Sequence, residues 1–221
     1  MTRVRHLVLV RHGQTQSNAD SRMQGQLDTD LSDLGRSQAV TTAEILSTRK
    51  PLAIYASHLR RAWDTAEELA KRSGLTVNRQ ENLQETALGE WQGMTHHEVD
   101  AAYPGQREIW RDSPRWAPPG GESRIDVADR SVPVVKHVVD NEPEWGVDGS
   151  ERPVVLVAHG GVICALTAAL LDLPVDSWPV FRVMGNASWT QLSAHGDARF
   201  SELRWRLDVW NASAQVSNDV L

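Results

Sequence analysis

The chain has 221 residues, enough for one large domain with a substantial core. Hydrophobic residues make up 40% and charged residues 24% of the chain, proportions that exclude a disordered, collagen-like or disulfide-stapled protein. Its 23 basic and 29 acidic side chains leave a net charge of −6, so we expect no nucleic-acid partner, and any anion site has to be a local basic pocket.

The chain starts with a predicted strand and a predicted helix. Residues 6–10 form an apolar, β-branched run that is typical of a buried strand, and this run ends at Arg11. After a polar loop, Ser32 can cap a helix. The apolar residues of that helix fall on one stripe, which consists of Leu34, Ala39, Val40, Ala43 and Leu46.

The same alternation then repeats. Residues 52–56 predict a second buried strand, and the helix that follows begins at Ser57 and ends at Gly74. Residues 76–79 predict an edge strand. Strands that alternate with helices are typical of a layered α/β fold around a mainly parallel sheet.

Residues 103–121 have a different composition, with four prolines, three glycines and two tryptophans. This composition predicts a loop or lid without a core element. Residues 123–140 then predict a helix that is bent or interrupted at Pro133. The last predicted strands are residues 153–158, 189–192 and 203–209.

Together these elements predict a single domain over residues 1–221, built as a three-layer α/β/α sandwich. We expect a lid or insertion at about residues 94–150 and a loose C-terminal tail from about residue 212. The one cysteine, Cys164, fits a reducing compartment, and the sequence has neither a signal-peptide core nor a membrane-spanning apolar segment. The predicted location is therefore the cytoplasm, with no membrane partner.

Two of the predicted strands end in a histidine followed by a glycine, at His12-Gly13 and at His159-Gly160. In α/β sheets ligands gather at the carboxyl ends of the strands, so the two histidines are expected to face one pocket. Glycine lets backbone N–H groups come close to a ligand. Because His159 also precedes a helix, this edge is a natural anion site.

Arginines are predicted at the same edge. Arg11 precedes His12, and Arg60 and Arg61 follow the strand of residues 52–56. Arg61 is favoured over Arg60 because it begins a helix whose buried side is marked by Ala62. Two arginines and two histidines form a receptor for a doubly charged tetrahedral anion, namely phosphate.

Metal-free phosphoryl transfer also needs a proton donor for the leaving alcohol. The best candidate is Glu85, which lies in an irregular, glycine-punctuated segment, and Glu81 and Glu90 remain open alternatives. No His, Cys, Asp and Glu spacing in the sequence is typical of a metal site. We therefore expect neither a metal nor another cofactor.

These residues resemble the histidine phosphatase superfamily, in its phosphoglycerate-mutase-like branch. The resemblance rests on Arg11-His12-Gly13-Gln14-Thr15 with Asn18, on Gln24-Gly25 through Asp30 to Gly35, on Ser57-x-Leu59-x-Arg61-Ala62, on Glu85 with Gly89-x-Trp91-x-Gly93, and on His159-Gly160. It implies that His12 is phosphorylated during turnover and that Glu85 is the proton donor. It also implies a set of residues that hold the phosphoryl group or the substrate, namely Arg11, Asn18, Gln24, Gly25, Arg61, His159 and Gly160.

Four further stretches resemble bacterial phosphatases of glycosylated phosphoglycerates, at residues 21–28, 116–123, 184–190 and 204–213. This implies a small phosphorylated sugar-acid substrate, glucosyl- or mannosyl-3-phosphoglycerate, in methylglucose lipopolysaccharide synthesis, and it suggests a homodimer. Trp116 in the predicted lid is a candidate for sugar stacking. The alternatives are a phosphoglycerate mutase, a broad-specificity phosphomonoesterase or a catalytically silent binding module. A short lid favours hydrolysis over mutase action, which has to shield the phosphoenzyme from water.

Overall fold

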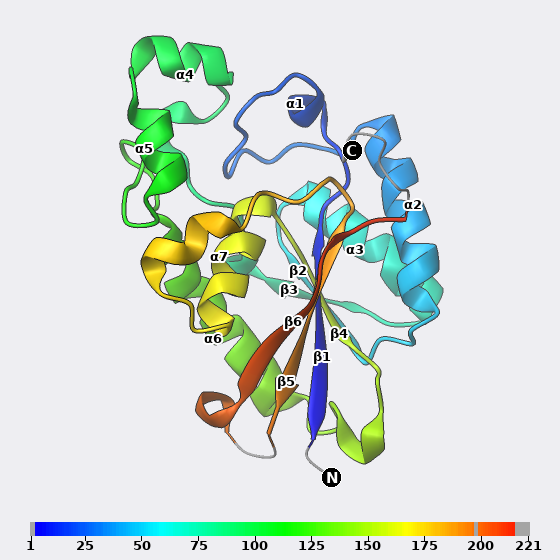
Figure 1. Ribbon diagram of the computed structural model, residues 1–221. Helices are drawn as coiled ribbons and strands as arrows, with labels where there is room; N and C mark the ends of the chain where they lie inside the picture. Colours follow the sequence, from blue (N-terminus) through cyan, green and yellow to red (C-terminus); the bar gives the residue numbers. More distant parts are fainter. Residues whose placement is uncertain (1–2, 197–198, 215–221) are drawn as a thin grey trace.

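A six-stranded sheet forms the centre of the computed structural model, which describes residues 3–196 and 199–214 (Figure 1). The strand order is β3-β2-β4-β1-β5-β6. The first four strands run parallel, β5 runs antiparallel to β1, and β6 runs antiparallel to β5. Their bounds are β1 (Val4–Arg11), β2 (Ala53–Ser57), β3 (Val77–Gln80), β4 (Val154–Ala158), β5 (Trp189–His195) and β6 (Arg204–Ala212). The α/β fold and the mainly parallel sheet are confirmed, with β3 at one edge as predicted.

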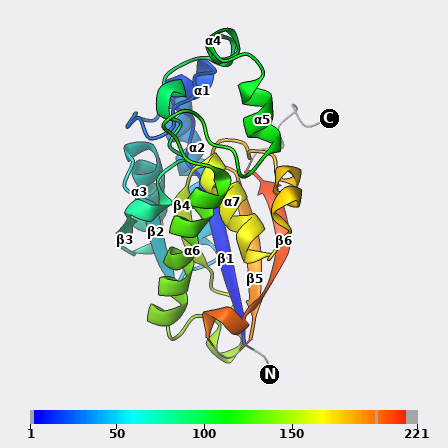
Figure 2. The same ribbon diagram turned by 90° about the vertical axis from the view of Figure 1, so that its left-hand side faces the viewer.

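Helices cover both faces of the sheet and make the three layers (Figures 1 and 2). Successive residues of β1 point to opposite faces. Val8 packs in the cluster of α2 (Asp33–Ser47) and α3 (Arg60–Ser73), whereas Leu7 packs in the cluster of α6 (Arg124–Asn141) and α7 (Gly160–Leu170). β1 and β4 are therefore buried on both faces, as their continuous apolar runs predict.

Short elements lie beyond the carboxyl ends of the parallel strands (Figures 1 and 2). They are α1 (Gln16–Ala19), α4 (His96–Ala102) and α5 (Gln106–Asp112). Single 3₁₀ turns cover Glu81–Leu83, Gly89–Trp91, Val147–Gly149, Val175–Val180 and Phe200–Glu202. No helix in the described ranges is both long and apolar enough to cross a bilayer.

The structure of the predicted lid region differs from the sequence prediction in its helices. α5 is a helix within the segment predicted to be a loop, and α6 runs through Pro133 without interruption. Ser123 caps α6 in a capping box with Asp126, and buried residues on both sides of the proline hold the helix against the core: Val127, Ala128, Ser131, Val134, Val135 and Val138. Because α6 belongs to the core, it does not form part of a cover, and the segment that stands over the sheet edge is narrower than residues 94–150.

Two smaller differences concern single elements. Leu34, predicted within the buried stripe of α2, is 53% exposed, and the buried face of that helix includes Gly35 and Thr42 in its place. The close approach of Gly35 to the loop after β1 leaves no room for a side chain, since an added Cβ would collide with the backbone of Gln14. β6 extends to Ala212, and most of the predicted tail lies outside the described residues.

Candidate active site

A pocket of about 390 Å³ opens at the carboxyl edge of the sheet. Seven of the predicted site residues line it, namely Arg11, His12, Asn18, Gln24, Gly25, Arg61 and Glu85. The remaining lining residues are Ser21, Arg22, Met23, Thr86, Leu88, His96, Trp110, Gly161 and Val183. The volume suits a small-molecule substrate, and the topology brings together side chains that are up to 172 residues apart in the sequence, since 183 − 11 = 172.

His12 follows β1 and has a fixed tautomer. Its Nδ1 lies 2.6 Å from the carbonyl oxygen of Gly13, and because a carbonyl can only accept, Nδ1 carries the proton. The Nε2 lone pair is therefore available to attack an electrophile. Burial, followed by the charges of Arg61 and Arg11, lowers the pKa of His12 well below its ordinary value of 6.5. The ring is neutral at pH 7, as a nucleophile requires.

His159 follows β4, and its ring centroid lies 5.1 Å from that of His12. Its Nδ1 accepts a hydrogen bond from Arg61 Nε at 3.2 Å, so its Nε2–H donates to Ser57 Oγ at 2.9 Å. Burial, followed by the charge of Arg61, lowers its pKa well below 6.5. His159 is therefore a neutral ring that accepts a hydrogen bond from Arg61 and orients its guanidinium.

The two arginines form the cationic part of the pocket. Arg61 is 1% exposed, and its two terminal nitrogens donate to the carbonyl oxygens of Leu27 and Gly25 at 2.6 and 2.8 Å. Burial lowers the pKa of Arg61 to about 10, so it stays charged at neutral pH. Arg60 points outward, with a side chain that is 63% exposed. The choice between the two arginines thus agrees with the sequence prediction.

Arg11 donates through Nη1 to the carbonyl oxygen of Met184. Its Nε is buried and lacks a hydrogen-bond partner within the described part of the chain. A Cβ placed on the neighbouring Gly160 would lie 2.5 Å from Val183 Cγ1 and 3.7 Å from that nitrogen, so the glycine is what lets Val183 pack closely beside Arg11. An unpaired buried N–H next to a neutral imidazole is a donor for an incoming anion.

The loop after His12 is braced by amide side chains. Asn18 closes a capping box with Thr15 at the start of α1, and its Oδ1 also accepts a hydrogen bond from Asn186 at 3.1 Å. Asn186 bonds the carbonyl oxygen of His12 at 3.3 Å as well. Gln24, which is 8% exposed, accepts a hydrogen bond from Thr29. Asn186 is linked to His12 across 174 residues, a contact that no local sequence pattern indicates.

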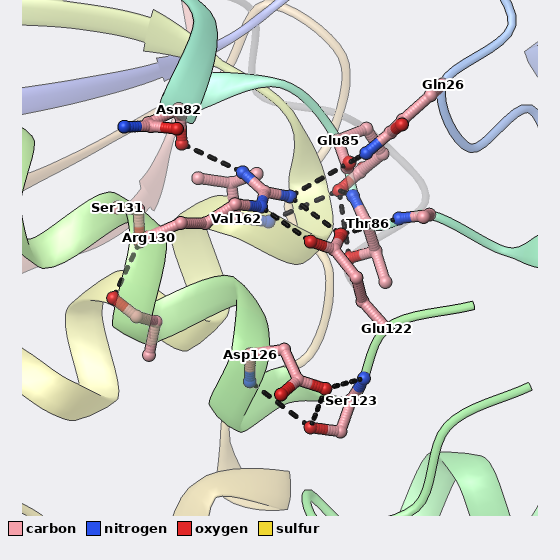
Figure 3. Close-up of polar contacts among 12 residues, drawn as sticks. Gln26, Asn82, Glu85, Thr86, Glu122, Ser123, Asp126, Arg130, Ser131 and Val162 are labelled. Atoms are coloured by element: carbon pink, nitrogen blue, oxygen red, sulfur yellow. Dashed lines mark hydrogen bonds and ion pairs between the residues drawn. The ribbon is translucent and has the colours of Figure 1, made fainter. Parts of the chain in front are cut away.

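Glu85 sits at the N-terminus of α7. Its carboxylate accepts hydrogen bonds from the backbone N–H groups of Thr86, Gly161 and Val162 at 2.8, 3.1 and 3.3 Å (Figure 3). A Cβ on Gly161 would lie 2.6 Å from Glu85 Oε1 and would also collide with the Thr86 hydroxyl. Glycine at position 161 is therefore what allows the carboxylate to sit on the helix end.

The two alternative acids lie elsewhere. The side chain of Glu81 is 74% exposed at the surface beside Arg79, and Glu90 accepts a hydrogen bond from the hydroxyl of Tyr103. Neither lines the pocket. Among the described residues, no three His, Cys, Asp or Glu side chains come together as a possible metal-ligand set.

The rim of the pocket comes from the segment over the sheet edge. Trp110 on α5 lines the pocket, whereas Trp116 packs against Trp91 with a ring-centroid distance of 5.5 Å and is not among the lining residues. Trp110 also packs against Trp91, with a centroid distance of 5.9 Å, so the two tryptophans differ in whether they line the pocket, and the stacking role of Trp116 stays a prediction. His96 and Arg22 also line the pocket. Arg22 lies in the resembling stretch of residues 21–28, whereas His96 lies in none of those stretches.

A mixed sheet that carries two histidines, two arginines and a carboxylate at the ends of its strands is typical of an enzyme that transfers phosphoryl groups. The chain belongs to the histidine phosphatase superfamily, branch 1, whose family model matches residues 7–212. That match runs from within β1 to the end of β6 and includes every predicted site residue.

The more particular similarity is to glucosyl-3-phosphoglycerate phosphatases. The protein of that name from Mycolicibacterium vanbaalenii is 66% identical over 224 residues, covering 99% of this chain and 100% of the relative. The one from Mycobacterium tuberculosis is 62% identical over 222 residues, with the same coverage. The solved structure of the mycobacterial enzyme in complex with VO3 has a TM-score of 0.92 and 62% identity, covering 95% of this chain and 100% of that one.

Proposed function

We propose that this chain hydrolyses glucosyl-3-phosphoglycerate to glucosylglycerate and inorganic phosphate through a phosphohistidine on His12. The observation that carries the proposal is the fixed neutral tautomer of His12, with a free Nε2 beside Arg11 and Arg61. The named relatives, at 66% and 62% identity over the full chain, support the substrate. Mannosyl-3-phosphoglycerate is a further proposed substrate.

In the first step His12 Nε2 attacks phosphorus, and the bond between phosphorus and the glycerate oxygen breaks. Glu85 in its protonated form gives its proton to that oxygen, so glucosylglycerate leaves as a neutral alcohol. Arg11 and Arg61 stabilise the charge on the equatorial oxygens, with Asn18, Gln24, Gly25, His159 and Gly160 completing the cradle. In the second step water attacks the phosphohistidine, Glu85 takes the water proton, and phosphate leaves while His12 regains its neutral form.

The proposed sugar subsite is the rim formed by residues 94–122, which we propose as the lid. Trp110 Nε1 is buried, with no hydrogen-bond partner within residues 3–196 and 199–214. Because Trp110 lines the pocket, we propose that its indole N–H becomes a donor for a sugar hydroxyl when substrate binds. The half-exposed Arg22, whose Nη1 donates to the carbonyl oxygen of Gly93 at 2.9 Å, is a cation near the proposed glycerate carboxylate.

We further propose a homodimer that acts in the cytoplasm, in methylglucose lipopolysaccharide synthesis. Among the strands of the described residues, β6 lies at an edge with one side unpaired, and Leu207 and Val209 on it are 36% and 38% exposed. Val180 and Val183, before β5, are 70% and 59% exposed. An exposed apolar edge strand is a template for pairing with a second copy. Sedimentation of the full chain at several concentrations tests this, and a monomer throughout would refute it.

The activity is tested by phosphate release in the presence of EDTA over four substrates: glucosyl-3-phosphoglycerate, mannosyl-3-phosphoglycerate, 3-phosphoglycerate and p-nitrophenyl phosphate. We expect the highest kcat/KM for the first, and an acid-labile phosphoryl label on His12 during turnover. Isomerisation of 3-phosphoglycerate in place of hydrolysis would favour a mutase. Comparable rates on all four would favour a broad-specificity phosphomonoesterase.

A further inference from the structure

Arg130, on α6, reaches behind the proposed proton donor. Its side chain is 14% exposed and makes four hydrogen bonds (Figure 3). Nε and Nη2 donate to the two carboxylate oxygens of Glu122 at 2.8 and 3.0 Å. Nη1 donates to the carbonyl oxygen of Asn82 at 2.8 Å, and Nη2 donates to that of Glu85 at 3.0 Å. The Arg130 guanidinium therefore connects the Glu122 carboxylate to two backbone carbonyl groups, those of Asn82 and Glu85.

Glu122 forms hydrogen bonds with the same segment on the C-terminal side of Glu85, at Ala87. Its Oε2 accepts a hydrogen bond from the backbone N–H of Ala87 at 2.8 Å, and its own backbone N–H donates to the carbonyl oxygen of Ala87 at 2.8 Å. Gln26 adds a third attachment, because its Nε2 donates to the Glu85 carbonyl oxygen at 3.0 Å (Figure 3). The backbone is thus held before, at and after Glu85.

Residues 84–88 belong to no helix or strand. No ladder of regular hydrogen bonds fixes their backbone, so the Arg130–Glu122 pair replaces it. The carboxyl group of Glu85, by contrast, accepts hydrogen bonds from the N–H groups of Gly161 and Val162 in α7, whereas Arg130 lies on α6. If the backbone shifted, the carboxylate would either lose these hydrogen bonds or turn away from the pocket. Placement within about 0.5 Å is what a proton donor needs to act on a leaving oxygen.

We propose that Arg130 and Glu122 are positioning residues that act through Glu85, so that their pairing sets the efficiency of proton donation to the leaving alcohol. The inference rests on the proposed function, in which Glu85 is the donor. It assigns a catalytic consequence to an ion pair that touches neither the pocket nor the reacting atoms, since neither residue lines the pocket. A purely structural pair would instead affect all substrates alike.

The test uses the dependence of rate on the leaving group, in the full chain. An alcohol such as glucosylglycerate needs a proton as it departs, whereas nitrophenolate does not. The variants are Arg130→Met, Arg130→Lys, Glu122→Gln and Glu85→Gln, together with the double variant Arg130→Met/Glu85→Gln. The matched control is Arg152→Met, because Arg152 also donates to two backbone carbonyl oxygens, those of Lys50 and Pro51, away from the pocket.

For Arg130→Met and Glu122→Gln we expect kcat/KM on glucosyl-3-phosphoglycerate to fall about tenfold or more, with a change of less than about threefold on p-nitrophenyl phosphate. Arg130→Lys, which keeps a charge and a donor, should recover part of the loss. The double variant should be no slower than Glu85→Gln alone, because both changes disable the same step. Arg152→Met should leave kcat/KM unchanged for both substrates. Thermal melting identifies the temperature range in which every variant is folded.

Equal losses on both substrates, or losses that add to those of Glu85→Gln, would overturn the inference. Because removing one partner of a buried pair is destabilising, Glu122→Gln and Arg130→Lys keep the test decisive if Arg130→Met does not fold. The Glu85→Gln variant distinguishes a failure of the proposed donor role from a failure of the positioning role. If this variant alone loses equally on both substrates, the donor role in the proposed function fails. If it shows the leaving-group effect while the Arg130 and Glu122 variants do not, only the positioning role fails.

Discussion

The pocket has a buried floor, which includes His12 and Arg61, and a more exposed rim, which includes Trp110 and Arg22. At the floor, His12 and Arg61 are 3% and 1% exposed, and they follow or begin elements that pack into the central core. At the rim, Trp110 lies on a helix of seven residues that buries none of its side chains, and Arg22 is 45% exposed. The floor is therefore suited to one fixed reaction, and the rim is suited to variation in the molecule that carries the phosphate.

The largest expected effect comes from the floor. His12→Gln removes the attacking nitrogen, so we expect turnover to fall by on the order of 10⁴-fold or more on every phosphate ester, irrespective of the rest of the substrate. Phosphate release and trapping of a labelled phosphoenzyme measure this. A variant that retains a labelled intermediate, or that loses activity on one substrate only, would break the distinction between floor and rim.

Gly161→Ala acts on the boundary between the two regions. The added methyl group occupies the space of the Glu85 carboxylate, and we expect kcat/KM to fall about 10²-fold for an alcohol leaving group, with little change for nitrophenolate. Steady-state kinetics on the two kinds of ester measure it. If both esters slow equally while the melting temperature stays constant, the glycine serves the fold of α7 and not the seat of the acid.

Trp110→Phe sharpens the account of the rim. The substitution keeps an aromatic ring and removes the unpaired Nε1–H, so we expect about a tenfold rise in KM for glucosyl-3-phosphoglycerate with unchanged kinetics on p-nitrophenyl phosphate. Trp116→Phe is the matched control, because its ring packs on Trp91 outside the pocket. The opposite pattern, in which Trp116→Phe alone changes the sugar preference, would return the role to the residue indicated by the sequence.

The smallest expected effect concerns stability at the floor. The pKa values of His12 and His159 are lowered on folding, chiefly by burial, so the unfolded chain binds protons first as the pH falls below about 6.5. The free energy of unfolding should therefore decrease from pH 7.5 to 5.5, by on the order of 1 kcal/mol per histidine. Urea unfolding measures it, and His159→Gln should show a shallower pH dependence than the native chain. An identical slope in the variant would contradict the assignment of a buried neutral ring.

The floor was largely predictable because its determinants are local. A β-branched run followed by His-Gly marks His12 and His159, and helix periodicity separates Arg61 from Arg60. Seven predicted residues accordingly line one pocket. Local patterns favoured Glu85 but could not exclude Glu81 and Glu90, since the environment of Glu85 is made by Gly161, 76 residues away. The neutral state of His159 was likewise not predictable from local patterns, because burial and the distant Arg61 lower its pKa.

The rim was less predictable because its composition hides its structure. Prolines and glycines between residues 103 and 121 suggested a loop, yet α5 forms between them. Pro133 suggested a bent or interrupted helix; the helix is not interrupted, because packing of Val134, Val135 and Val138 into the core outweighs the lost hydrogen bond. Trp110 and Trp116 have similar sequence contexts, and tertiary packing decides which of them faces the pocket.

The position of β1 determines when the protein loses its capacity to become phosphorylated on heating. This strand lies between β4 and β5, and residues Leu7 to Val10 are at most 2% exposed, so its amides are expected to exchange with solvent only when the whole domain opens. His12 is joined directly to that strand. On heating, the capacity to become phosphorylated should therefore persist until the cooperative melting transition and disappear with it, which makes self-labelling a direct reporter of global unfolding.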